Sequence, residues 1–166
     1  MAMVGLFWIT EDAVYLGAEP IGTASGVRLT EDGVETLGMG NGASWSWEQI
    51  RRIEVRDLAE RSAGRRLVSM AIDSLVVLVT GDGVLPPAFT VHLETVAESV
   101  DVSALAAVAG AIYPQPEIEL SRTLLERLAD GGAAVGDLLA WRREQPDDST
   151  PRREEREALL RKWAGE

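Results

Sequence analysis

The chain has 166 residues, of which 46% are hydrophobic, and it carries a formal net charge of −11 at pH 7. That length suits one ordinary domain with an appendage, and the strongly acidic charge argues against binding to a nucleic-acid backbone. The absence of cysteine excludes disulfides, thiolate catalysis and cysteine-ligated metals.

The start of the chain carries no sign of a targeting segment. Met-Ala-Met-Val has no basic residue, and Glu11 and Asp12 interrupt the first apolar stretch too early for a secretory signal. The longest uncharged run, Val102 to Pro116, is too short and too interrupted by proline to span a bilayer of about 30 Å. We therefore expect a cytoplasmic protein.

The first predicted element is a hairpin over Gly5 to Gly17, in which T-E-D-A forms the turn between two apolar strands. The run Leu29 to Gly38 (LTEDGVETLG) repeats this pattern, and Val79 to Val84 (VTGDGV) is a weaker third copy. Because the copies are unevenly spaced, they favour an antiparallel meander over a solenoid.

The stretch from Gly26 to Asp57 is the one around which the rest is organised. Its apolar residues, Val27, Leu29, Val34 and Leu37, follow the alternation of half-buried strands. The E-D-G sequence between these strands predicts a type I turn closed by a glycine bulge at Gly33.

The same stretch continues through two tryptophans into another strand. Trp45 and Trp47 are spaced i, i+2 and so share one strand face, which we expect to be buried because an indole brings a large apolar area. Beyond them, Ile53 and Val55 are expected to point inward, and the charged residues that alternate with them are expected in water.

After Asp57 the apolar spacing changes to that of a helix. Residues 63–75 predict a short inserted helix, with a long strand as the alternative. Leu75 to Thr80 then predicts a fully buried strand, and Ala88 to Thr95 predicts a further strand with His92 on its polar face.

The remainder of the chain is expected to be helical. Pro151 is expected at a first helical position, and Leu159, Leu160 and Trp163 would form a narrow apolar stripe on a helix that needs a surface to lie on. The predicted helices are Ser103 to Tyr113, Ile118 to Ala129 ended by Gly131 and Gly132, Gly136 to Arg143, and the charged segment that begins at Pro151.

These features suggest a family. A strand ending in T-E-D-G-V, a second strand, W-E-Q-I leading into I-E-V, and an Ala-rich helix after the strands resemble the bacterial pleckstrin-homology-like (PH-like) domains over residues 1–113. The resemblance implies an α+β fold, in which an antiparallel β-barrel or sandwich is closed by a capping helix over residues 103–113. Residues 114–166 would then be a helical C-terminal extension.

The same resemblance implies a scaffold that binds proteins, peptides or lipid head groups and has no common active site. Lipid-binding members carry basic residues in the first hairpin, where this chain has Glu11 and Asp12. We therefore expect no membrane lipid as a partner.

One candidate interaction surface is a cluster of arginines. It holds six of the seven basic residues in the first 113, in a chain that is otherwise acidic. Such a patch suits an acidic partner, a phosphate, or the Glu-Asp turns of a neighbouring copy; the alternative is a set of solvated faces paired with nearby carboxylates. The cluster consists of Arg51, Arg52, Arg56, Arg61, Arg65 and Arg66.

A second candidate surface is provided by Trp141 and Trp163 on the tail helices. Tryptophan dominates interface hot spots, so these residues are candidates for contacts with another subunit or partner. The alternative, that they pack back on the β-domain, stays open.

The remaining candidates favour structural roles. Glu11, Asp12, Glu31 and Asp32 lack the ligand spacing of a calcium loop, and G-M-G-N-G precedes a strand rather than a helix, unlike a phosphate-binding loop. His92 lies beside Glu94 without further partners in sequence. We expect no metal, no cofactor and no catalytic residue.

The sequence therefore predicts a non-enzymatic module for protein interaction or self-association, with an unidentified protein or a second copy of the chain as its partner. The alternative is a small-ligand-binding protein or weak hydrolase that uses His92 and Glu94 in a pocket between the β-domain and the tail helices.

Overall fold

The computed structural model describes residues 2–20, 24–38, 42–56, 59–60, 88–106, 112–147 and 149–165. The predicted inserted helix (63–75), the predicted strand at 75–80 and the third hairpin copy (79–84) lie outside these residues, as do Arg61, Arg65 and Arg66.

The described residues form two antiparallel sheets and three α-helices. The first sheet has the order β1 (Ala2–Val4), β2 (Phe7–Ile9), β3 (Val14–Leu16), β4 (Gly26–Leu29), β5 (Gly33–Leu37) and β6 (Ser44–Ser46). A 3₁₀ turn, η1 (Trp47–Gln49), leads into the second sheet, which contains β7 (Ile50–Arg56), β9 (Ala88–Thr95) and β10 (Ser99–Leu105). A short parallel pair, β8 (Ala59–Glu60) with β11 (Ile112–Tyr113), precedes α2 (Gln115–Asp130), α3 (Val135–Glu144) and α4 (Arg153–Ala164).

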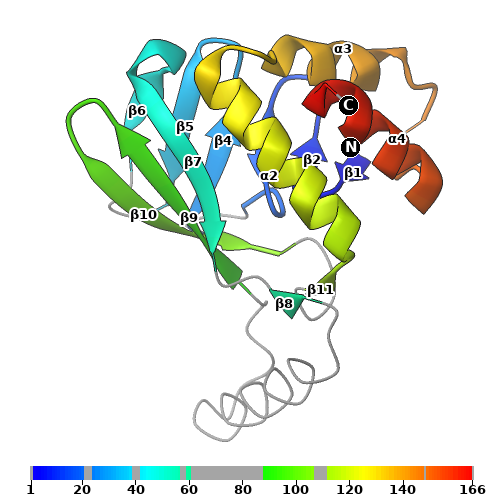
Figure 1. The fold of residues 1–166 in the computed structure, drawn as a ribbon, viewed down its shortest axis with the longest axis horizontal. Helices are drawn as coiled ribbons and strands as arrows, with labels where there is room; N and C mark the ends of the chain where they lie inside the picture. Colours follow the sequence, from blue (N-terminus) through cyan, green and yellow to red (C-terminus); the bar gives the residue numbers. More distant parts are fainter. Residues whose placement is uncertain are drawn as a thin grey trace, which may run out of the picture.

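In Figure 1, α2 runs across the sheets, and α3 and α4 lie beside it near β1 and β2. The two sheets touch where β10 approaches β4, and the Ala18 amide donates a 2.6 Å hydrogen bond to the Leu105 carbonyl. No strand pairing among the described residues closes the sheets into a barrel. The two antiparallel sheets and three helices confirm the predicted α+β class.

The repeated T-E-D turns are closed by their threonine side chains. Thr10 Oγ1 accepts a 3.0 Å hydrogen bond from the Ala13 amide and donates a 2.8 Å bond to the Ala13 carbonyl. Thr30 makes the same two bonds with Gly33, each at 3.2 Å. Such a hydroxyl substitutes for missing ladder partners within the turn, so the threonine of the repeated pattern has a structural role in both turns.

The glycine bulge predicted at Gly33 is wrong, because Gly33 is not among the glycines with positive φ. Gly33 instead begins β5 and pairs with Ser46. A Cβ on Gly33 would overlap the backbone carbonyl oxygen of Trp45, so glycine is needed there for close approach of two strands.

The capping helix predicted over residues 103–113 is also wrong at both of its ends. Ser103–Leu105 is the end of β10, paired with β9, and Ile112–Tyr113 forms β11; residues 107–111 lie outside the described part. Val102 and Ala104 alternate with exposed serine in β10 and are buried. Pairing with β9 thus overrides the weak helix preference of an Ala-rich sequence.

The three tail helices are confirmed, with shifted ends. Gly131 adopts a left-handed conformation, φ 87°, at the end of α2, as its position after the apolar register predicts. The last helix begins at Arg153, two residues after the predicted Pro151. One hydrophobic core joins sheet residues such as Phe7 and Leu93 to helix residues such as Leu124 and Leu160, so the β-domain and the tail share a single interior.

Gly5, in the turn between β1 and β2, predicts a stability effect. Its φ is +58°, and a Cβ there would overlap Ser121 Oγ and lie 2.9 Å from Leu160 Cδ1. We expect Gly5→Ala to lower the free energy of unfolding by about 2 kcal/mol or more. Gly42→Ala is the control, because a Cβ at Gly42 meets nothing within 4 Å and should change stability by less than about 0.5 kcal/mol. Urea unfolding measures both, and equal effects would contradict the prediction.

Candidate functional site

Helix α3 rests on the two T-E-D turns, which join β2 to β3 and β4 to β5. Arg143 Nε, near the C-terminus of α3, donates a 3.0 Å hydrogen bond to the Glu11 carbonyl in the first T-E-D turn. At the other end, the Glu31 carboxylate of the second T-E-D turn lies beside Gly136, 3.0 Å from where a Cβ would stand. A carboxylate is favourable at a helix N-terminus, and the N-cap residue of α3, Ala134, has no capping side chain. The repeated turns therefore position α3.

Helix α4 is held against α2 and β1 by apolar packing. Leu160 is fully buried and Trp163 is 6% exposed, and both belong to the common core. Of the predicted stripe of Leu159, Leu160 and Trp163, the last two are therefore buried, and Leu159 is partly buried against the core.

A buried ion pair adds to this packing. Arg156 Nε of α4 lies 2.5 Å from Glu117 Oε1 in the first turn of α2, and Glu117 is 1% exposed. Arg156 Nη1 also donates to the Pro151 carbonyl at 2.9 Å, so one guanidinium ties together the start of α4 and the start of α2.

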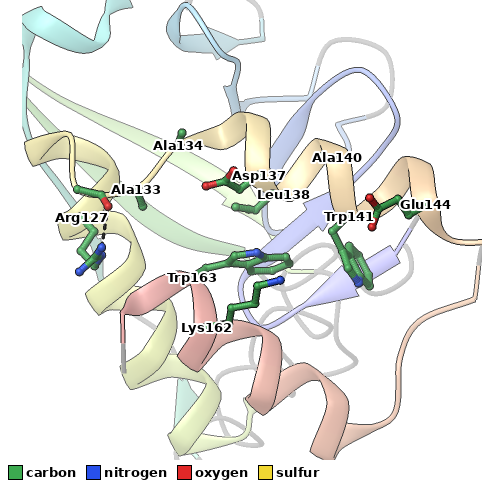
Figure 2. A pocket seen from close by; sticks show the side chains of 11 residues that line it. Arg127, Ala133, Ala134, Asp137, Leu138, Ala140, Trp141, Glu144, Lys162 and Trp163 are labelled. Atoms are coloured by element: carbon green, nitrogen blue, oxygen red, sulfur yellow. Dashed lines mark hydrogen bonds between the residues drawn. The ribbon is translucent and has the colours of Figure 1, made fainter.

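These anchors leave a cleft of about 380 Å³ between the three helices. Figure 2 shows Arg127 at one end of the cleft, Glu144 at the other, and Lys162 and Trp163 between them. The lining residues are Arg127, Gly132, Ala133, Ala134, Asp137, Leu138, Ala140, Trp141, Glu144, Lys162 and Trp163.

A second hollow of about 400 Å³ meets the first at Trp141 and Lys162, which line both. It continues between α3 and α4 toward the segment that connects them, where Gln145 and Pro151 line it. Together the two hollows form a groove, named here the α3–α4 groove, with Trp141 near its middle.

Each wall of the α3–α4 groove is one row of residues at helical spacing. The wall from α3 consists of Asp137, Ala140, Trp141 and Glu144, and the wall from α4 consists of Glu155, Ala158, Leu159 and Lys162. Both rows follow the order i, i+3, i+4, i+7, which is one helix face. Each row is therefore a charged residue, an alanine, a large apolar residue and another charged residue.

Three charged side chains of the groove have no ion-pair or hydrogen-bond partner within the described part of the chain: Asp137, Glu144 and Lys162. On the outer face of α4, by contrast, Glu157 lies 3.0 Å from Arg153 and 3.9 Å from Arg161. The groove thus presents free charges of both signs around an aromatic centre.

The two tail tryptophans have different roles. Their rings form an edge-to-face pair with centroids 5.8 Å apart at an interplanar angle of 77°. Trp163 packs back into the core, and Trp141 is only half-buried against it. Trp141 is consequently the tail tryptophan whose ring is partly exposed.

The arginine cluster is partly described and partly paired. A bulge in β7 between Ile50 and Arg52 leaves Arg51 and Arg52 both exposed. Arg52 Nη1 and Arg56 Nη2 then lie 3.0 and 2.8 Å from the two carboxylate oxygens of Glu54. The hydrogen bond from Arg56 lowers the pKa of Glu54 below its ordinary value, and the same bond raises the pKa of Arg56. Arg52 and Arg56 therefore agree with the alternative stated above, in which the arginines lie on solvated faces and pair with nearby carboxylates.

His92 lies on the same outer face of the second sheet, among carboxylates. Its Nδ1 is 2.5 Å from Asp101 Oδ1 on β10, and its Nε2 is 3.4 Å from Glu94 Oε1 on β9. Glu54 of β7 is its cross-strand neighbour on the other side. The side chain is 13% exposed, more buried than the solvated histidine that alternation suggests, and it lines neither hollow of the α3–α4 groove.

Within the described ranges, no three or more histidine, aspartate and glutamate side chains are grouped so that they could hold a metal ion. In the same part of the chain, no helix combines the length and the apolar composition needed to cross a membrane. Comparison of the chain with protein-family models, curated proteins and solved structures found no match.

Sequence reasoning identified Trp141 and Trp163 but missed the charged and small residues that complete the two groove rows. The signal was available, because Asp137, Ala140, Trp141 and Glu144 have the helical spacing. What the sequence did not show is that this face of α3 and the corresponding face of α4 lie side by side.

Because the pair between Arg156 and Glu117 is buried, we expect the loss of Arg156 to cost more stability than the loss of an arginine from an exposed pair on the same helix. Arg156→Ala leaves a buried carboxylate without its partner, so we expect a loss of about 3 kcal/mol in unfolding free energy. Arg153→Ala, on the same helix, removes a pair whose arginine is 54% exposed and should cost less than about 1 kcal/mol.

A double variant, Glu117→Leu with Arg156→Leu, should be more stable than Arg156→Ala because it leaves no uncompensated charge. Chemical denaturation of the variants provides the comparison. If Arg156→Ala and Arg153→Ala lost equal stability, the pair would not anchor α4.

Proposed function

We propose that the chain is a non-enzymatic protein-interaction module of the PH-like type, and that the α3–α4 groove is its contact surface. The PH-like part of the proposal is supported by the order of elements. Two antiparallel sheets, joined by the W-E-Q segment of η1, are followed by a helix that packs on β7. The resemblance implies a capping helix after the strands, and in this proposal α2, the helix that follows them and packs on β7, has that role.

The observation that carries the proposal is the half-buried Trp141 between free charges of both signs. Tryptophan contributes strongly to binding when a partner completes its burial, and unpaired charges at the edge of a contact select and steer partners. The described hollows contain no nucleophile–base pair that would favour an enzyme.

The arginine cluster supports the proposal less well than the groove. Arg52 and Arg56 are already paired with Glu54, and pairs of this exposure contribute little beyond what water offers. A partner that bound Arg52 or Arg56 would have to compete with Glu54 for it.

The test of the proposed function is capture of partners by the full chain. Removing α4 would not test it, because Leu160 and Trp163 belong to the core and their loss would unfold the protein. We therefore choose Trp141→Ala, which removes the half-buried ring. The matched control is Val96→Ala, since Val96 is an apolar side chain with 54% exposure outside the groove.

We expect the tagged wild-type chain and Val96→Ala to retain the same proteins from a lysate of the native host, and Trp141→Ala to lose them by roughly tenfold or more. Circular dichroism establishes that both variants are folded. If Trp141→Ala and the wild type retained the same proteins equally well, the proposal that the α3–α4 groove is the contact surface would be wrong.

A further inference from the structure

The α3–α4 groove is electrically polarised along its length. At the end near the segment that connects α3 to α4, the lining charges are the carboxylates of Glu144 and Glu155. Toward the C-terminus of α2, the lining cations are Arg127 and Lys162, with Asp137 as the one carboxylate. Figure 2 shows Arg127 and Glu144 at opposite ends. The groove is thus acidic at one end, net basic at the other and aromatic between them.

A surface with this pattern is complementary to itself. In an isologous dimer, the same patch of both copies forms the interface. If one residue of the first copy contacts a second residue of the other copy, the two-fold axis repeats that contact with the copies exchanged. If the axis passes near Trp141, the acidic end of each groove meets the basic end of the partner's groove. Two equivalent sets of attractive contacts then form at once.

We propose that the occupant of the α3–α4 groove is the α3–α4 groove of a second copy of this chain, arranged antiparallel about a two-fold axis. This inference rests on the proposed function, since it names the partner of that same surface. Trp141 and Leu159 supply the apolar centre, and Ala140 and Ala158, one on each wall, let the paired helices approach closely.

The four partly exposed helices of such a dimer would form a bundle, in which knobs from one pair enter the groove of the other. The free side chains of Glu144 and Lys162 acquire partners in this arrangement, whereas they have none within the described part of a single chain. We expect the dimer to weaken as salt is added, because its contacts join exposed charges.

The experiment uses two charge reversals in the full-length chain, Lys162→Glu and Glu144→Lys. Each variant alone places like charges opposite one another twice across the two-fold axis. A mixture of the two variants restores attraction at both contacts. In the mixed dimer the introduced carboxylate of one copy faces the introduced ammonium of the other, while the second contact keeps its native pair of charges. Glu126→Lys, an exposed α2 charge reversal outside the groove, is the control.

Sedimentation velocity at about 0.05 M and about 0.5 M salt measures the association. We expect the wild type and Glu126→Lys to dimerise with salt-dependent affinity, and each groove variant alone to bind itself at least roughly tenfold more weakly. An equimolar mixture of Lys162→Glu and Glu144→Lys should recover the dimer. Recovery on mixing cannot come from a change within one chain.

A wild type that stays monomeric, or a mixture that shows no recovery, would overturn the second-copy proposal. If such a monomer still captured other proteins through Trp141, the proposed function would stand with a different partner. If capture also survived Trp141→Ala, the proposed function would fall with it.

Discussion

The burial of Leu160 and Trp163 against α2 and β1 is the interaction on which the arrangement of the tail depends. Helix α4 is short and highly charged, so it has little stability of its own. Its apolar stripe stabilises the helix only when a surface covers the stripe. The Arg156–Glu117 pair determines where along α2 the stripe lies, because a buried carboxylate must keep its cation. With α4 in place, α3 has a neighbour, and the groove between them exists.

Helix α3 has one face in the core and one face in the groove. Val135, Leu138 and Leu139 are buried in the core, and the face with Asp137, Trp141 and Glu144 lines the groove. The two T-E-D turns set its orientation, one through the Glu11 carbonyl and the other through the Glu31 carboxylate. A repeat that reads as turn chemistry in the sequence therefore also serves as the support of the helix that carries the candidate site.

The contrast between paired and free charges separates the two candidate surfaces. On the second sheet, Arg52 and Arg56 share Glu54, and His92 lies between carboxylates, so these three side chains have partners within one chain. In the groove, Asp137, Glu144 and Lys162 have no such partners in the described residues. We therefore propose the groove as the contact surface, whereas the density of arginines in the sequence indicated the outer face of the second sheet.

The sequence by itself determined the elements whose signal is local: the hairpins with their T-E-D turns, the strand Ala88–Thr95, and the helices that became α2 and α3. Side-chain periodicity and turn chemistry act over a few residues, so they can be read without knowing what lies nearby. The tertiary structure decided the rest. Ser103–Leu105 became strand because β9 offered it backbone partners, which composition cannot report. Trp163 is buried and Trp141 is partly exposed, although both lie on amphipathic helices. The packing of α4 on α2 and β1 decides which of the two indoles is covered.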